Sequence, residues 1–165
     1  MPFASGVGRV ALAAALLSCL GYTLVQAASP QAAQIKPRQD KLRDMGGALK
    51  AITDELKKPK VDWDNVIIPN TQTIKDRSAY LLNWFPKGSG PESGVKTYAL
   101  PALWQKGDDF TKLGKAMQAE TAKLKQVAAT KNAGALKDEA FTLGKACKAC
   151  HDNYRSPDYE KENDD

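Results

Sequence analysis

The sequence has 165 residues, which is enough chain for one ordinary domain built around a single hydrophobic core. Its 24 basic and 19 acidic side chains give a formal net charge of +5, but the basic residues are scattered and not interleaved with aromatic ones, so we expect no nucleic acid partner. With 3 cysteines in the whole chain, a disulfide-stapled fold is excluded as well.

The first segment of the chain has the pattern of a secretory signal peptide. Arg9 precedes an uncharged, alanine-rich run over residues 10–25, which small residues follow. The run is too short for a comfortable bilayer span. We therefore predict a signal peptide over residues 1–27, cleaved after Ala27, and a periplasmic protein with no membrane association after cleavage. Lipid attachment through Cys19 is the alternative, but the apolar run continues past that cysteine.

The rest of the chain shows helical periodicity, without a comparable run of strand-like alternation. The first helix is predicted from about Pro37, a tolerated first-turn proline, to about Lys58, which precedes Pro59. Its seam steps by three and four residues and contains one arginine: Ile35, Arg38, Leu42, Met45, Leu49, Ile52 and Leu56. Such a seam is typical of a helix that packs in a bundle.

The next two predicted helices flank a long loop. The second helix begins after Pro69, with Asn70 as its cap, and ends before Pro86. Glycine, serine and proline dominate the loop over residues 87–100, and the third helix opens at Pro101. Loops of this length inside a small domain are often functional.

The fourth helix is predicted to follow Asn132-Ala133-Gly134, and it carries two cysteines on its buried seam. Four helices joined mostly by short links predict an all-α fold, an antiparallel four-helix bundle over residues 28–155. The acidic residues 156–165 are predicted to form a disordered tail.

Residues 147–151 read CKACH, the CxxCH pattern of covalent c-type haem attachment. Cys147 and Cys150 lie three residues apart on one helical face, so each can bond one haem vinyl group, and His151 can ligate the iron. The motif predicts one covalent haem c. A thiol redox pair and a metal site are the alternatives, but such a pair usually opens a helix in a βαβ unit, and zinc needs four ligands.

The sequence resembles the cytochrome c′ family, the class II c-type cytochromes, over nearly the whole mature chain. The resemblance is carried by CKACHDNYR at 147–155 and by four shorter motifs: Arg38-Gln39, Met45-Gly46, Pro101-x-x-Trp104 and Leu143-Gly144-x-x-Cys147. It implies a cytochrome c′-like bundle with haem attached near the C-terminus of the last helix. Ordinary cytochromes c place CxxCH near the N-terminus and a ligating methionine downstream, and this sequence does not.

Several charged and polar residues are predicted to surround the haem. Arg38 places a charge on an apolar seam, so it needs a partner unless it reaches solvent, and we predict a bidentate pair with a haem propionate. The resemblance supports this pairing and implies that Gln39, Tyr98 and Ala99 line the haem edge. Arg155, about one turn beyond the histidine, is predicted to cover the proximal face, the alternative being a cation at a helix C-terminus.

Leu42 occupies the position that the resemblance places against the iron, where the related c-556 type has methionine. Because leucine cannot ligate iron, we expect a five-coordinate, high-spin haem with an apolar pocket beside the iron. The protein is then expected to bind small gases such as NO or CO in that pocket, to transfer electrons, or to do both. The alternative is a six-coordinate, low-spin c-556-type electron carrier with Met45 as axial ligand, which needs a shift of about 5.4 Å along the helix.

The sequence shows no catalytic triad and no paired acid and base, so we do not expect an enzyme. The expected partners are a diatomic gas or a small redox protein. The resemblance also suggests a homodimer through the first two helices, although Lys41, Asp44 and Lys50 put charges on that surface.

Overall fold

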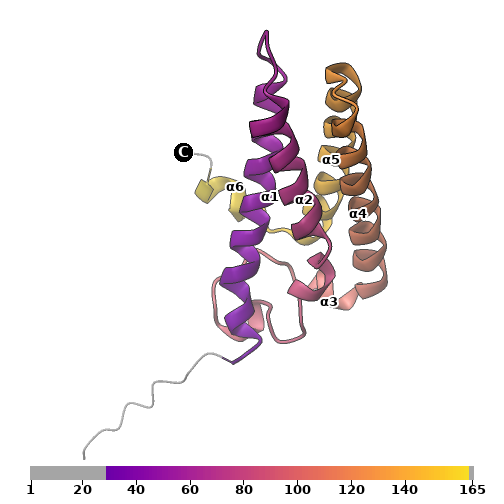
Figure 1. Cartoon of the computed structure of the whole chain (residues 1–165). Helices are drawn as coiled ribbons and strands as arrows, with labels where there is room; N and C mark the ends of the chain where they lie inside the picture. Colours follow the sequence, from indigo (N-terminus) through magenta and orange to yellow (C-terminus); the bar gives the residue numbers. More distant parts are fainter. Residues whose placement is uncertain (1–28, 164–165) are drawn as a thin grey trace, which may run out of the picture.

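The computed structural model describes residues 29–163, so the signal peptide predicted over 1–27 lies outside the described residues. Within residues 29–163 four long helices form an antiparallel bundle, in which α1 packs on α2, α2 on α4 and α4 on α5 (Figure 1). Their bounds are Ile35–Glu55 for α1, Ile68–Ser78 for α2, Gly107–Ala129 for α4 and Ala133–Tyr154 for α5. Two shorter helices are α3 (Ala102–Gln105) and α6 (Asp158–Asn163).

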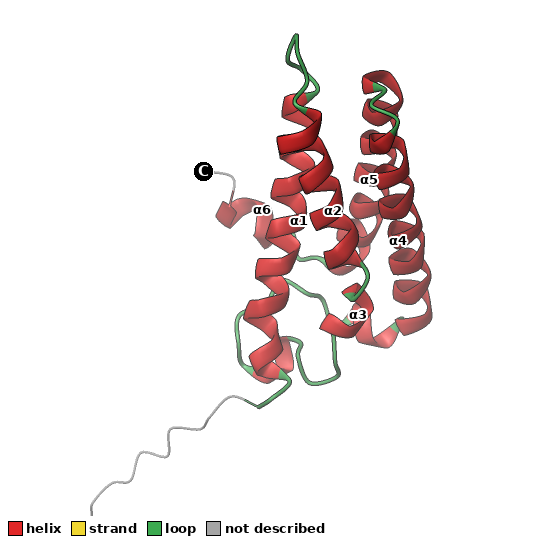
Figure 2. Cartoon of the chain, viewed as in Figure 1, coloured by secondary structure: helices red, strands yellow, loops and turns green. Residues whose placement is uncertain are grey.

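The predicted all-α bundle is confirmed, because the described part of the chain consists of helices and loops without a strand (Figure 2). Short 3-10 turns cover Ala32–Gln34, Leu81–Trp84 and Pro91–Ser93. No helix within residues 29–163 is long and apolar enough to cross a membrane.

The seam predicted for the first helix is the face that α1 buries. Ile35, Arg38, Met45 and Ile52 are buried there. The helix ends at Glu55, three residues before the predicted end. The Glu55 carboxylate then closes the following turn, because Oε1 accepts a hydrogen bond from the Asp62 amide at 2.9 Å and Oε2 pairs with Lys58 Nζ at 2.6 Å.

The predicted start of the second helix is wrong. The chain is already helical from Trp63, in a π-turn over Trp63–Ile67 that runs directly into α2. Pro69 does not interrupt the helical path, since it stands in the first turn of α2 directly after the π-turn, a position where proline is tolerated. Asn70 is not a cap either, since its Nδ2 donates to the Val66 carbonyl at 2.7 Å.

The third predicted helix is divided in two. Lys106 adopts φ −113° and ψ 47°, which breaks the helical path between α3 and α4. The fourth helix begins at Ala133, two residues before the predicted start, because Asn132 Oδ1 caps α5 by accepting from the Ala135 amide at 3.0 Å.

The acidic tail is not wholly disordered, which corrects the prediction for residues 156–165. Helix α6 forms over Asp158–Asn163. Its start is stabilised by Ser156, whose Oγ accepts from the Asp158 amide at 3.2 Å. Asp158 and Glu160 lie in the first turn of α6, where negative charge interacts favourably with the helix dipole.

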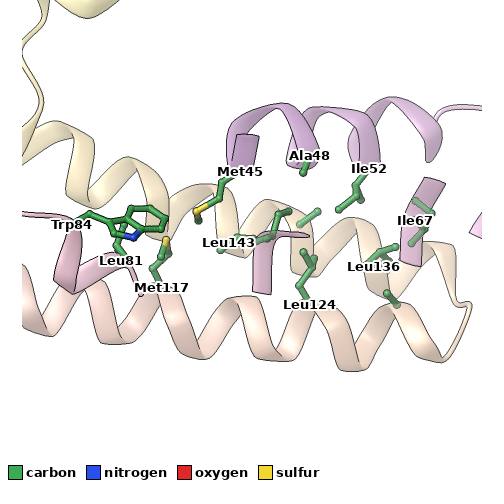
Figure 3. Close-up of a cluster of buried hydrophobic side chains, with 13 residues drawn as sticks. Met45, Ala48, Ile52, Ile67, Leu81, Trp84, Met117, Leu124, Leu136 and Leu143 are labelled. Atoms are coloured by element: carbon green, nitrogen blue, oxygen red, sulfur yellow. The ribbon is translucent and has the colours of Figure 1, made fainter. Parts of the chain in front are cut away.

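The core of the bundle is a cluster of 13 buried side chains contributed by α1, α2, α4, α5 and the turns before and after α2 (Figure 3). A smaller cluster of Leu103, Phe110 and Tyr154 lies where α3 and α4 meet the end of α5. Tyr154 Oη donates to Asp109 Oδ2 at 2.5 Å, and burial together with this bond raises the pKa of Tyr154 to about 12. The end of α5 is thus fastened to the beginning of α4.

An acidic pair, Glu120 and Glu139, lies between α4 and α5, and the side chain of Glu120 is 29% exposed. Glu139 is 5% exposed, and Oε1 of Glu139 and Oε2 of Glu120 are buried without a hydrogen-bond donor. Lys123 Nζ pairs with the other oxygen of Glu139 at 2.6 Å. Glu120 can donate a hydrogen bond to Glu139 only when it is protonated, and this bond, and then burial, raise the pKa of Glu120 above its ordinary value. The folded protein therefore releases the Glu120 proton at a higher pH than the unfolded chain does.

Glu120→Gln is expected to stabilise the protein at neutral pH. A carboxyl whose pKa is higher in the folded state loses stability as pH rises above the unfolded value of about 4.3 and through the folded one. Glutamine supplies the missing N–H donor permanently, so the melting temperature of the variant should decline less between pH 5 and 8. Thermal unfolding at several pH values measures this. A parallel decline in wild type and variant would contradict the shared proton.

Candidate haem-binding site

A cavity of about 540 Å³ opens between α1, α5 and the segment that precedes α3. Its volume falls in the range of small-molecule and cofactor sites. All nine residues predicted for the site line it: Arg38, Gln39, Leu42, Tyr98, Ala99, Cys147, Cys150, His151 and Arg155. Residues from three distant parts of the sequence are therefore brought together.

The CxxCH motif forms the last turns of α5, where the helix faces the cavity. Cys147 and Cys150 are both half-buried, and no disulfide joins them. Burial raises the pKa of Cys147, and it raises that of Cys150 to about 11. Redox-active CxxC pairs have lowered thiol pKa values, so this environment disfavours the thiol-redox alternative.

His151 lies beside the two cysteines at the cavity wall. Burial, and then the positive charge of Arg155, lower the pKa of the imidazole. A neutral imidazole is the form that ligates a metal ion. Within residues 29–163 no group of three or more His, Cys, Asp or Glu side chains is placed to hold a metal ion.

The walls of the cavity are largely apolar. Leu42, Met45 and Leu49 contribute from α1, Met117 from α4 and Leu143 from α5. Met45, Met117 and Leu143 lie together in the core between the helices (Figure 3). Such a lining favours a largely apolar ligand.

Three glycines leave room along this lining. Gly46 and Gly47 of α1 and Gly144 of α5 border the cavity, and a Cβ added to any of them would meet no other atom within 4 Å. Glycine inside a helix costs about 1 kcal/mol relative to alanine. The open glycine surfaces and the apolar walls fit a bulky planar macrocycle that is anchored through Cys147 and Cys150.

Arg38 is 2% exposed, so the alternative of a side chain that reaches solvent is wrong. Its Nη1 donates to Ser89 Oγ at 2.8 Å, and its Nη2 donates to the Ser89 carbonyl at 2.7 Å and to Thr97 Oγ1 at 2.8 Å. The guanidinium also lies 4.7 Å from the centre of the Phe85 ring. Burial lowers the pKa of Arg38 to about 10, which leaves it charged at neutral pH. Arg38 thus fastens the long loop to α1, and its pairing with a haem propionate stays a prediction.

Arg38→Leu is expected to destabilise the protein by about 3 kcal/mol, because the buried Ser89 and the partly buried Thr97 acceptors lose their charged donor. Urea unfolding of the haem-loaded protein measures the change. Arg43→Leu is the matched control, since Arg43 also borders the cavity but is exposed and paired with Asp40. It should change stability by less than about 1 kcal/mol. Equal losses in both variants would contradict the fastening role of Arg38.

Tyr98 and Ala99 border the cavity because their segment pairs with the end of α5. The Leu100 amide donates to the Tyr154 carbonyl at 2.9 Å, and the Ser156 amide donates to the Tyr98 carbonyl at 2.7 Å. Gln39 lies on the adjoining edge, where its Nε2 approaches the Lys96 carbonyl at 3.4 Å.

The sequence did not reveal every residue at the cavity. Thr97 was not singled out, although it holds Arg38. Met117 was visible only as a seam residue of its helix, and nothing local indicated that it faces the cavity. Tyr159 was assigned to the disordered tail, although it lies on α6 and borders the cavity too.

A protein-family model described as cytochrome c′ matches residues 33–155, which include every residue of the predicted site. The chain belongs to the cytochrome c′ family. Proteins of this family carry covalently attached haem c, so the chain is a c-type cytochrome with haem c as its cofactor. The four-helix bundle is the fold of the family as well.

Relatives of known sequence include both kinds of class II cytochrome. Cytochrome c′ of Rhodopseudomonas palustris is 35% identical over 130 residues, which is 74% of this chain and 81% of that protein. Cytochrome c-556 of Agrobacterium fabrum is 32% identical over 147 residues, which is 87% of this chain and 92% of that protein. Cytochrome c-554 of Cereibacter sphaeroides is 42% identical, but only over 77 residues, so the chain spans 48% of its length.

Solved structures agree with this assignment. Cytochrome c′ from Thermochromatium tepidum superposes with a TM-score of 0.71 at 27% identity, covering 79% of this chain and 99% of that one. A cytochrome c′ described as showing ligand-controlled dimer dissociation superposes with a TM-score of 0.70 at 26% identity, with the same coverage of the two chains.

Proposed function

We propose that this cytochrome binds diatomic gases such as NO or CO at a five-coordinate, high-spin haem and exchanges electrons with a small redox protein, without an enzymatic role. Cys147 and Cys150 would attach the haem, and His151 would ligate its iron. Haem supplies an iron centre that can bind gases and change oxidation state. The protein residues attach it, exclude water and present an apolar surface to the ligand.

The observation that carries this proposal is Leu42 at the cavity wall. Its side chain has no nitrogen, oxygen or sulfur atom, so it cannot ligate iron at the position where a second ligand would come from α1. Leu42 is also partly buried against the main core, which restricts the space beside it. A tight apolar pocket of this kind suits small uncharged ligands.

A sulfur ligand is the competing arrangement, and Met45 is no longer its only candidate. Met45 and Met117 both border the cavity, from α1 and α4. Both side chains are committed to the core, since Met45 is 7% exposed and Met117 is 4% exposed, and they lie near Leu81 and Trp84 (Figure 3). Either thioether would leave that packing in order to ligate iron, which favours the five-coordinate state.

Visible absorption and EPR spectra of the ferric protein test the proposal. We expect a high-spin spectrum and CO binding to the ferrous protein. A low-spin spectrum with a sulfur-to-iron charge-transfer band would overturn the proposal in favour of a c-556-type electron carrier. Met45→Leu and Met117→Leu would then identify the ligand, because only one of the two should abolish that band.

Export and dimerisation complete the proposal. We place the protein in the periplasm after removal of residues 1–27, and in a homodimer through α1 and α2. Three features of that surface can contribute: Lys41 Nζ lies 5.3 Å from the centre of the Trp84 ring, Asp44 pairs with Arg77 at 3.1 Å, and Tyr80 is 65% exposed. Sedimentation of the ferrous protein with and without CO tests the dimer, and a monomer under both conditions would reject it.

A further inference from the structure

Helix α6 lies outside the residues that the family model matches. The family model matches residues 33–155, whereas α6 covers Asp158–Asn163. The chain turns away from the end of α5 directly into α6 (Figure 1). Tyr159 of this helix borders the same cavity as His151. A segment outside the common domain thus contributes to the wall of the haem site.

Contacts with the body of the protein fix the position of α6. The Tyr159 ring meets the Tyr98 ring edge-on, with centres 5.2 Å apart and planes at 89°. Tyr98 Oη donates to Glu162 Oε2 at 2.8 Å, and Lys96 forms an ion pair with the same carboxylate. The Ser156 amide, just before the helix, donates to the Tyr98 carbonyl at 2.7 Å.

Two side chains of α6 engage Arg155. Its guanidinium lies 4.5 Å from the centre of the Tyr159 ring and forms an ion pair with Glu160. The Arg155 side chain is 26% exposed, and its backbone amide donates to the His151 carbonyl at 3.0 Å. A cation held between a ring and a carboxylate loses the rotational freedom of an ordinary surface arginine.

We propose that Tyr159 and Glu160 are positioning residues that hold Arg155 over the His151 side of the haem, and that Glu160 partly offsets the positive charge that Arg155 presents to the iron. This inference rests on His151 being the axial ligand, as proposed above. A positive charge near the haem favours the reduced state, which carries one positive charge fewer. The ion pair therefore lowers the reduction potential relative to a haem that faces an uncompensated arginine.

The midpoint potential of the haem-loaded protein tests this role. Glu160→Gln removes the offsetting charge but keeps the shape of the side chain, so we expect the reduction equilibrium to shift about threefold toward the ferrous state. That corresponds to about 30 mV for a one-electron couple. The shift should shrink at high salt, because the pair is partly exposed.

Asp158→Asn is the matched control. It removes the same charge from the same helix, but Asp158 pairs with Lys161, whereas Arg155 pairs with Glu160. We expect a clearly smaller shift than in Glu160→Gln. Equal shifts in the two variants would overturn the positioning role, because they would show only the summed electrostatic effect of the acidic residues in the tail. In an Arg155→Gln background, the effect of Glu160→Gln should be smaller, and full additivity would also overturn it.

Hydrogen exchange supplies a readout that does not depend on the iron. In the intact protein the amides of residues 158–163 should exchange more slowly than in a free peptide, and Tyr159→Leu should accelerate them. Exchange at the free-peptide rate in the wild type would overturn the inference. A low-spin wild type would refute the proposed five-coordinate site, whereas a high-spin wild type with an unchanged potential in Glu160→Gln would refute only this inference.

Discussion

Replacing both Cys147 and Cys150 with serine is expected to yield a protein that no longer retains haem and no longer forms a stable bundle. The two thioether bonds are lost together, and a cavity of about 540 Å³ is left without its covalent occupant. At about 24 cal/mol per Å³, a dry cavity of that size would cost on the order of 10 kcal/mol, which is comparable to the whole stability of a domain. Water entering the open cavity reduces this cost, so the figure is an upper bound.

The single replacements separate the effect of losing one covalent bond to the haem from the effect of losing the haem that fills the cavity. Cys147→Ser and Cys150→Ser each keep one thioether, so haem should remain bound and the bundle should fold with reduced stability. Mass spectrometry of the periplasmic fraction measures the attached haem, and urea unfolding measures the stability. A wild-type mass without one added haem would contradict the attachment. A haem-free double variant with wild-type stability would contradict the view that haem completes the core.

The buried faces of the helices were predictable, because the apolar residues that form them recur in the sequence with the period of a helix. The seam of α1 is an example, since Ile35, Arg38, Met45 and Ile52 are buried as predicted. The ends of helices were less predictable. Pro69 suggested a break because proline usually stops a helix, but the preceding π-turn places it in a first turn, where it is tolerated.

The members of the site were predictable for a different reason. The CxxCH motif fixes one wall, and the family resemblance fixes which positions of α1 and of the segment before α3 face it. The partners of Arg38 were not predictable, because Ser89 and Thr97 lie in an irregular loop whose path no periodic pattern reveals. The role of the tail was missed because its acidic composition suggested disorder, whereas its contacts with Tyr98 and Arg155 are tertiary.

Leu42→Met is expected to convert the site into a six-coordinate haem with a histidine and a methionine ligand. Methionine is close to leucine in volume and more flexible, so the packing cost should stay below about 1.5 kcal/mol. A diatomic ligand must then displace an iron–sulfur bond. We expect CO affinity to fall about tenfold or more, equivalent to at least about 1.4 kcal/mol, and the reduction potential to rise.

Two further variants make the Leu42 prediction specific. Leu49→Met adds the same thioether to the same cavity wall, but two turns or about 10 Å farther along α1, so it should leave spin state and CO affinity close to wild type. Leu42→Ala should instead enlarge the pocket and strengthen CO binding, at a stability cost of about 2 kcal/mol, because Leu42 is only partly buried. Ferric spectra and CO titrations of the three variants decide the matter. If Leu49→Met becomes low-spin while Leu42→Met stays high-spin, the iron faces a different turn of α1 from the one that carries Leu42.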